Sequence, residues 1–205
     1  MIDWLISNGG RVFDLAVLHT TIAVLATLLG LIVALIGGAV VANISWLTGP
    51  ILMISGLLFT IPSLVMFIFI PILFGTKILD PANIVIALSV YAFALLFGGV
   101  VDALRSVPGE TKQAAEAMGI GRWRMLLTVE FPLSIPVISA TLRVAADSNV
   151  SLVCVGALIG VGGLGDLFTE GFQRNYLTPI LWGIILSVVL AVLFDAVIVF
   201  TERIA

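Results

Sequence analysis

The sequence is short of charge. Only 10% of its 205 residues are Asp, Glu, Lys or Arg, whereas soluble domains average about 25%. Hydrophobic residues make up 61% of the chain, and the mean hydropathy is +1.27. A soluble fold cannot bury that much apolar surface, so the composition excludes an ordinary globular domain and predicts an integral membrane protein.

Groups that bind metals or nucleic acids are also scarce. The chain has one cysteine, Cys154, and one histidine, His19, so it cannot form an internal disulfide and offers no cluster of metal ligands. The net charge of -3 includes no block of like charges, which argues against a nucleic-acid surface. We predict no metal site and no nucleic-acid partner, and we interpret Cys154 and His19 as structural.

A phosphate-binding loop is missing as well. No G-x-x-x-x-G-K-[ST] pattern occurs, and neither lysine, Lys77 or Lys112, follows a glycine, so the chain lacks the cradle that holds ATP phosphates. Gly160, Gly162 and Gly165 satisfy G-x-G-x-x-G, but they follow an apolar span rather than a strand, which excludes a dinucleotide fingerprint. These glycines indicate either a tight external turn or a gate. We predict no catalytic residues.

Long apolar runs dominate what is present. From Leu15 to Thr76 the chain has no charged residue over 62 positions, and one helix of that length would be about three times longer than a bilayer core is thick. The chain must turn back, and Asn43–Pro50 gathers residues typical of turns. With the later polar breaks, this predicts a single all-α domain over 1–205 with about five spans, at 15–42, 50–74, 83–101, 133–159 and 179–200.

The longest hydrophilic segment, 102–132, carries four of the nine basic residues. Short loops rich in Lys and Arg stay in the cytoplasm, so we predict that this segment is cytoplasmic, with the N-terminus outside and the C-terminus inside. Arg11, Lys77 and Arg174 would then lie outside, which weakens the argument from charge.

Within this segment, Gln113–Gly119 has the composition of a short helix that another protein can approach closely. Its three alanines favour a helix and add little bulk, and Gly119 provides a stop. A basic and aromatic stretch follows at 122–124, and Pro132 is expected to break the chain before the next span. Taken alone, the pattern also fits an amphipathic helix that merely connects two spans at the membrane surface.

The run from Gln113 to Pro132 resembles the EAA loop of bacterial ABC-importer permeases. In that loop an acidic residue, two alanines and a glycine are followed, after nine further residues, by an aliphatic residue, any residue, an apolar residue and proline. The positions in this register are Ala114, Ala115, Gly119, Val129, Phe131 and Pro132. Gln113 stands where the family usually has Glu, and Phe131 where it usually has Leu.

The resemblance covers the chain from about Thr20 onward. The stretches Phe59–Ser63, Pro132–Val137 and Gly160–Asp166 look most like permeases for osmoprotectants, which accumulate under osmotic stress and include glycine betaine, choline and carnitine. Methionine-importer permeases have a similar glycine-rich stretch, so a methionine or other small-solute importer is the alternative.

This resemblance implies a multi-pass permease subunit of the type I ABC-importer fold in the bacterial cytoplasmic membrane. It implies that the loop docks on ABC ATPase subunits, which bind ATP and Mg²⁺, while this chain binds no cofactor and is not itself an enzyme. The other expected partners are an identical or paralogous permease subunit, an extracytoplasmic solute-binding protein and membrane lipid. The coupling-loop residues implied are Gln113, Ala114, Ala115, Glu116, Gly119, Arg122 and Pro132.

Charged residues inside the predicted spans are candidates for a transport pathway. Arg143 and Asp147 lie four residues apart, on one face of a helix, and unpaired charges at membrane depth are costly. We therefore predict that they pair with each other in the bundle interior. With Ser148 and Asn149, this pair either lines the pathway or its cytoplasmic gate, or forms a structural clamp.

Three other residues bear on the pathway. Pro62 interrupts the second span, where a proline kinks a helix, and it joins the pathway candidates. Asp102 and Asp195 fall near the ends of their spans, and we interpret both as residues of the cytoplasmic boundary. Rival classes are a secondary transporter, for which Asp147 is the one suitable acid and no internal repeat is evident, and a membrane scaffold, whose loop need not match a docking motif.

Overall fold

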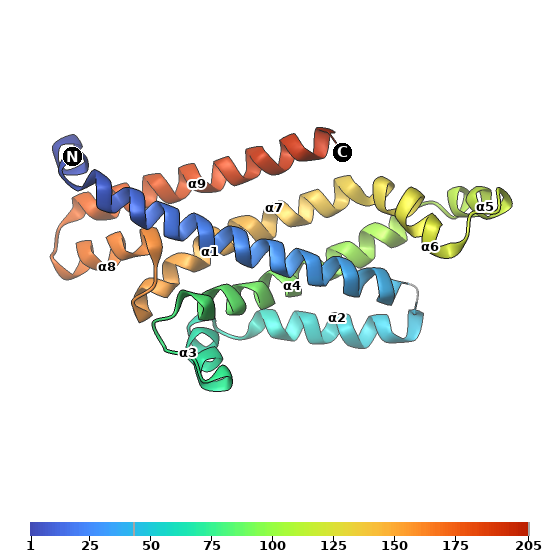
Figure 1. Ribbon diagram of the computed structural model, residues 1–205, viewed down its shortest axis with the longest axis horizontal. Helices are drawn as coiled ribbons and strands as arrows, with labels where there is room; N and C mark the ends of the chain where they lie inside the picture. The colour runs from blue at the N-terminus through green and yellow to red at the C-terminus, as the bar shows by residue number, and fades with distance from the viewer. Residues whose placement is uncertain (43, 205) are drawn as a thin grey trace.

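Long helices follow the long apolar runs of the sequence. The computed structural model describes residues 1–42 and 44–204, and within these ranges every regular element is helical (Figure 1). Four helices there are long and apolar enough to cross a membrane. They are α1 (Ile2–Ala42), α4 (Pro81–Ser106), α7 (Phe131–Val155) and α9 (Leu177–Ile204). The predicted all-α membrane bundle is confirmed.

Helix α4 forms the centre of the bundle, because it packs against both α1 and α7. Asp80 caps it by accepting the Ala82 N–H at 2.9 Å, and Pro81 occupies the first turn, so the helix begins at Pro81 rather than at 83. Gly30 lets α1 approach closely, since a Cβ there would lie 2.5 Å from the Cβ of Ala92. The fully buried side chains of α4 include Ile84, Leu88, Leu96, Phe97 and Val100.

The second predicted span is not one straight helix. Residues 50–74 are divided between α2 (Ser45–Thr60) and α3 (Ser63–Phe74), which are bent by 102°. Proline disfavours the helical conformation at the residue before it, and Ile61 is accordingly extended, with ψ 130°. Its carbonyl accepts the Tyr91 hydroxyl instead of a helical N–H. A turn was predicted over 43–50, but α2 already begins at Ser45. Asn43 lies outside the described residues.

The predicted break at Pro132 is wrong. The chain remains helical from α6 (Arg122–Met125) through a π-helical turn (Leu126–Glu130) into α7. Pro132 has no N–H to donate, and it directly follows the π-helical turn, in which the Phe131 N–H reaches back to the Leu126 carbonyl. The preceding widened turn accommodates the ring without ending the helix.

The connection between α7 and α9 is more regular than the predicted polar linker at 160–178. Two 3₁₀ turns, Gly156–Ile159 and Gly163–Gly165, lead into α8 (Asp166–Gln173). Figure 1 shows α8 and the N-terminus at one end of the molecule, and α5 (Gly109–Ala117) with α6 at the opposite end. The C-terminal end of α9 points toward the α5 end.

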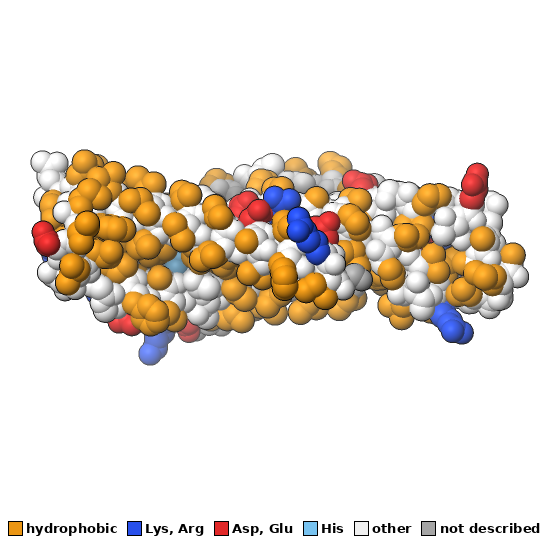
Figure 2. Space-filling model, turned by 90° about the horizontal axis from the view of Figure 1, so that it is seen from above, with side chains coloured by type: hydrophobic (Ala, Val, Ile, Leu, Met, Phe, Trp, Pro, Cys, Tyr) orange, Lys and Arg blue, Asp and Glu red, His pale blue; other side chains and the backbone are white. Residues whose placement is uncertain are grey.

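Much of the apolar surface remains uncovered. Figure 2 shows a face that is mostly hydrophobic, with a small group of acidic and basic side chains near the middle of its length. In the most apolar stretch of α9 only 6% of the residues are buried, against 50% in α4. Helix α9 therefore faces lipid or other subunits over most of its length.

Candidate functional site

Helix α5 is a short helix with a defined end. It stops after Ala117, and Gly119 adopts the left-handed conformation with φ 76°. The Ile120 N–H reaches back to the Ala115 carbonyl at 3.1 Å, and the Gly119 N–H reaches the Glu116 carbonyl at 2.9 Å. These two bonds form a Schellman cap, which favours glycine at the left-handed position. The predicted helix and its glycine stop are confirmed.

One face of α5 is open to solvent. The side chains of Gln113, Ala114 and Glu116 are exposed, and Met118 just beyond the helix is 73% exposed. Ala115, by contrast, is only 2% exposed and faces the protein. Of the residues predicted to form a docking surface, Ala115 therefore serves packing, whereas Gln113, Ala114 and Glu116 are available to a partner.

Lys112 ties α5 to the membrane helices, a role that the sequence did not reveal. Its ammonium lies 3.4 Å from the Glu130 carboxylate and donates to the Leu104 carbonyl, near the end of α4, at 3.2 Å. Glu130 is 6% exposed and sits at the last position of the π-helical turn. One side chain therefore links α5 both to α4 and to the π-helical turn that leads into α7.

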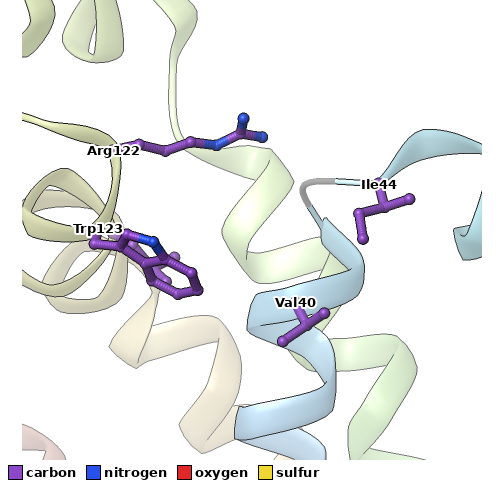
Figure 3. Close-up of a pocket in the computed structure, with 5 residues that line it drawn as sticks. Val40, Ile44, Arg122 and Trp123 are labelled. Atoms are coloured by element: carbon purple, nitrogen blue, oxygen red, sulfur yellow. The ribbon is translucent and has the colours of Figure 1, made fainter.

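A hollow of about 300 Å³ lies beside α6, between it and the end of α1. Arg122 and Leu126 line it, and the Trp123 ring and Val40 face each other across it (Figure 3). Trp123 is 70% exposed, as suits an indole at a membrane–water boundary. Arg122 thus lies beside the end of α1.

The predicted Arg143–Asp147 ion pair is wrong, because Arg143 pairs with Asp195 instead. The Arg143 guanidinium binds the Asp195 carboxylate of α9 through two N–H groups. Nη2 donates to Oδ2 at 3.1 Å, and Nε donates to Oδ1. The geometry is a planar fork on a carboxylate, which is the strong arrangement for an ion pair. Asp195 is therefore an interhelical partner and not merely a boundary residue, whereas Asp102 is exposed near the end of α4.

The other pathway candidates are not gathered at this pair. Asn149 is 1% exposed and donates to the Thr27 hydroxyl of α1 at 2.9 Å, so it joins α7 to α1. Ser148 is half-buried beside it, and Pro62 lies at the distant α2–α3 break. Only Asp147 remains near Arg143 and Asp195.

His19 connects three segments. It is completely buried, its Nδ1 accepts the Leu164 N–H at 3.3 Å, and its Nε2 lies 3.0 Å from the Val150 carbonyl. A carbonyl only accepts, so the ring is neutral with its proton on Nε2. The glycine-rich stretch therefore packs tightly against α1 and α7, and a Cβ at Gly163 would lie 2.7 Å from that of His19.

Charges at the α8 end form a second cluster. Glu170 of α8 binds Arg11 of α1 at 2.5 Å and Arg174 at 3.1 Å. Burial raises the pKa of the nearby Asp166 carboxyl above its usual value, although the Gly162 N–H and Arg11 oppose that shift. Among the residues that the structure describes, no group of His, Cys, Asp and Glu could hold a metal ion.

Proteins of similar sequence are permeases of bacterial transport systems. The chain is 31% identical over 198 residues to the osmoprotectant import permease protein OsmW of Salmonella typhimurium, covering 95% of this chain and 91% of that one. It is 28% identical over 204 residues to the carnitine transport permease protein OpuCD of Listeria monocytogenes, covering 99% and 90%. The glycine betaine/carnitine/choline transport system permease protein OpuCD of Bacillus subtilis is 28% identical over 197 residues, covering 96% and 85%.

Solved structures share the fold. The methionine ABC transporter MetNI in an inward-facing conformation matches with a TM-score of 0.80 at 18% identity, covering 91% of this chain and 92% of that chain. An amino acid ABC transporter with histidines matches with a TM-score of 0.71 at 16% identity, covering 98% and 97%. The fold is that of an ABC-transporter permease, as predicted.

Residues 26–203 match the family of binding-protein-dependent transport system inner membrane components, and the chain belongs to this family. It is therefore the multi-pass membrane component of such a system. This membership sets aside the rival classes of secondary transporter and scaffold.

Proposed function

We propose that this chain is the permease subunit of an ATP-driven importer for osmoprotectants such as glycine betaine, choline or carnitine. The relatives named for osmoprotectants, carnitine and choline, matched over nearly the whole chain, carry this proposal. A separate ABC ATPase would bind and hydrolyse ATP with Mg²⁺, and this chain would supply no ATPase site. An extracytoplasmic solute-binding protein would deliver the substrate.

The exposed face of α5 would be the surface on which the ATPase docks. Gln113, Ala114 and Glu116 present small and polar side chains there, and Lys112 connects the helix to α4 and α7. Closure of the ATPase would thus move α5 and both membrane helices together. In this arrangement the α5 end is cytoplasmic and the N-terminus is outside.

The Arg143–Asp195 pair would act as the gate on the cytoplasmic side of the pathway. It joins α7, which continues from α6 and the π-helical turn, to α9, which is buried over little of its length. An identical or paralogous permease would close the pathway from the other side, since four or five helices alone enclose little space. Movement of α7 relative to α9 would break the pair and open the way to the cytoplasm.

The substrate is tested by uptake of labelled glycine betaine, choline and carnitine at high osmolarity, in cells with and without this gene, with labelled methionine in parallel. We expect deletion to remove osmoprotectant uptake and to leave methionine uptake unchanged. Loss of methionine uptake alone would move the assignment to the alternative substrate class.

The docking surface is tested by copurification with the ATPase. Gly119→Asp places a side chain at φ 76° and a charge beside the exposed face, so the permease should lose its ATPase while remaining in the membrane. Gly10→Asp adds the same charge at the opposite end, where a Cβ meets nothing within 4 Å, and should retain it. Equal retention by both variants would place the docking surface elsewhere.

A further inference from the structure

A hollow of about 310 Å³ lies between α7 and α9 and is bordered by α8. Its size falls at the lower end of the range for small-molecule sites. Asp147 stands at the end nearer Arg143, and Phe168 lines it from α8. Ser151 and Ser187 contribute hydroxyl groups from the two long helices. The lining thus combines one carboxylate, one aromatic ring, small polar groups and the aliphatic side chains of Val150, Ile184, Val188 and Ala191.

The carboxylate of Asp147 lacks a counter-ion of its own. Arg143 uses both branches of its guanidinium on Asp195, and Asp147 forms no ion pair within the described ranges. Two carboxylates and one guanidinium leave a net charge of -1 on membrane-spanning helices, where Asp147 is exposed along the hollow. An uncompensated carboxylate there is costly, so a cation is the complementary occupant.

The ring of Phe168 is held in place at the far side of the hollow. Gly183 of α9 permits its close approach, since a Cβ at Gly183 would lie 2.6 Å from the ring. A fixed aromatic face attracts a quaternary ammonium, whose charge is spread over methyl groups that need no hydrogen bonds. A metal cation, by contrast, requires several oxygen ligands, and the lining provides one carboxylate.

We propose that this hollow binds the trimethylammonium group of the transported solute, with Asp147 as its counter-charge and Phe168 as an aromatic wall. The proposal rests on the proposed function, because it assigns a site within the permease to the cationic group that choline, carnitine and glycine betaine share. The hollow lies on the α8 side of the Arg143–Asp195 pair, so the solute would wait there before that pair opens.

The test uses the assembled permease–ATPase complex in nanodiscs without its binding protein, with labelled choline as the probe. Choline should bind saturably, and its neutral carbon isostere 3,3-dimethylbutan-1-ol should compete weakly. Asp147→Asn should weaken choline binding by about tenfold or more, the size expected for a lost charged contact. Asp14→Asn, an exposed carboxylate on α1, serves as the matched control and should bind normally.

The aromatic wall is tested in the same assay. Phe168→Leu should lower choline affinity while the binding of the neutral isostere is unchanged, and Phe168→Tyr should retain choline binding, because its ring still offers a π face. If Leu and Tyr behave alike, or choline and its isostere compete equally, the assignment is overturned. Failure of the wild-type complex to bind choline would also overturn it.

The reactivity of Cys154 reports whether the hollow is occupied. Cys154 is the one cysteine of the chain, lines this hollow, and its sulfur lies 3.8 Å from the Ser187 oxygen. Tetramethylammonium should slow alkylation of Cys154 by N-ethylmaleimide in the wild type but not in Asp147→Asn.

ATP-driven uptake in proteoliposomes separates the two proposals. Normal choline uptake by Asp147→Asn, with unchanged choline binding, would overturn the site alone. No uptake of any osmoprotectant by the wild type, with Cys154 still protected by tetramethylammonium, would overturn the proposed function and leave the site standing.

Discussion

At the scale of single residues, the glycine-rich stretch is held by one histidine. His19 uses both ring nitrogens, on Leu164 and on Val150, and it is fully buried against Gly163. Gly163 also adopts φ 51°, a conformation that side chains rarely accept. The glycine-rich stretch is therefore a tightly packed turn, and whether it also acts as a gate stays a prediction.

Gly163→Ala should therefore destabilise the protein by about 2 kcal/mol or more, because it combines an unfavourable φ with a clash. Thermal unfolding of the purified permease in detergent should show a lower midpoint. Gly10→Ala is the control, since a Cβ there meets nothing within 4 Å and the helix interior favours alanine. Equal midpoints for the two variants would contradict the packing argument.

The raised pKa of the Asp166 carboxyl predicts that the stability of the folded protein depends on pH. Burial raises the pKa of its carboxyl above 3.8, so the folded state holds a proton that the unfolded state releases, and stability is lost as pH rises from about 3.8 through the raised pKa. Asp166→Asn should unfold at a higher temperature than the wild type at pH 7, and the gap should shrink toward pH 4. A gap independent of pH would show that the carboxyl charge is not its cause.

At the scale of helices, α6, the π-helical turn and α7 form one continuous helical unit. The π-helical turn and α7 follow α6 without a break, and Lys112 fastens α5 to this unit through Glu130. Breaking a buried ion pair leaves a carboxylate without its partner, at a cost of about 3 kcal/mol. Without this pair, α5 would be free to move without carrying α4 and α7 with it.

Lys112→Met should consequently uncouple the transporter. It preserves most of the side-chain length but removes the charge, so the complex should keep its ATPase and hydrolyse ATP while uptake falls by about tenfold. Lys77→Met, an exposed lysine outside the coupling segment, should leave uptake unchanged. Restored uptake in the exchanged pair Lys112→Glu with Glu130→Lys would support the ion pair, and unchanged uptake in Lys112→Met would refute its role.

At the scale of the whole molecule, the Arg143–Asp195 pair holds α9, a helix with little other burial, against α7. A gate and a structural clamp differ in what their loss does. Arg143→Ala should abolish transport while the protein still elutes as a folded complex, because the other helices form the core. Exchange of the two charges, Arg143→Asp with Asp195→Arg, should restore part of the transport. Loss of the folded complex in Arg143→Ala would favour the clamp.

The sequence predicted the helical class, the apolar spans and the loop motif, because each depends on composition or on neighbours a few residues apart. The stop at Gly119 was readable for the same reason. Contacts between residues far apart in the sequence could not be predicted. Asp195 is 52 residues from Arg143, whereas Asp147 lies four residues away, at the spacing that favours an ion pair within one helix. The π-helical turn before Pro132 was missed because no short pattern indicates it.

The sparse burial of α9 also has a consequence for biosynthesis. The ribosome delivers α1, α4 and α7 to the membrane before α9, and these three already share the main core. Helix α9 is thus inserted beside a largely assembled body and docks on it through packing against α7 and α8 and through the Arg143–Asp195 ion pair. The apolar face of α9 that this chain does not bury must therefore be covered by lipid or by another chain as soon as the helix is inserted.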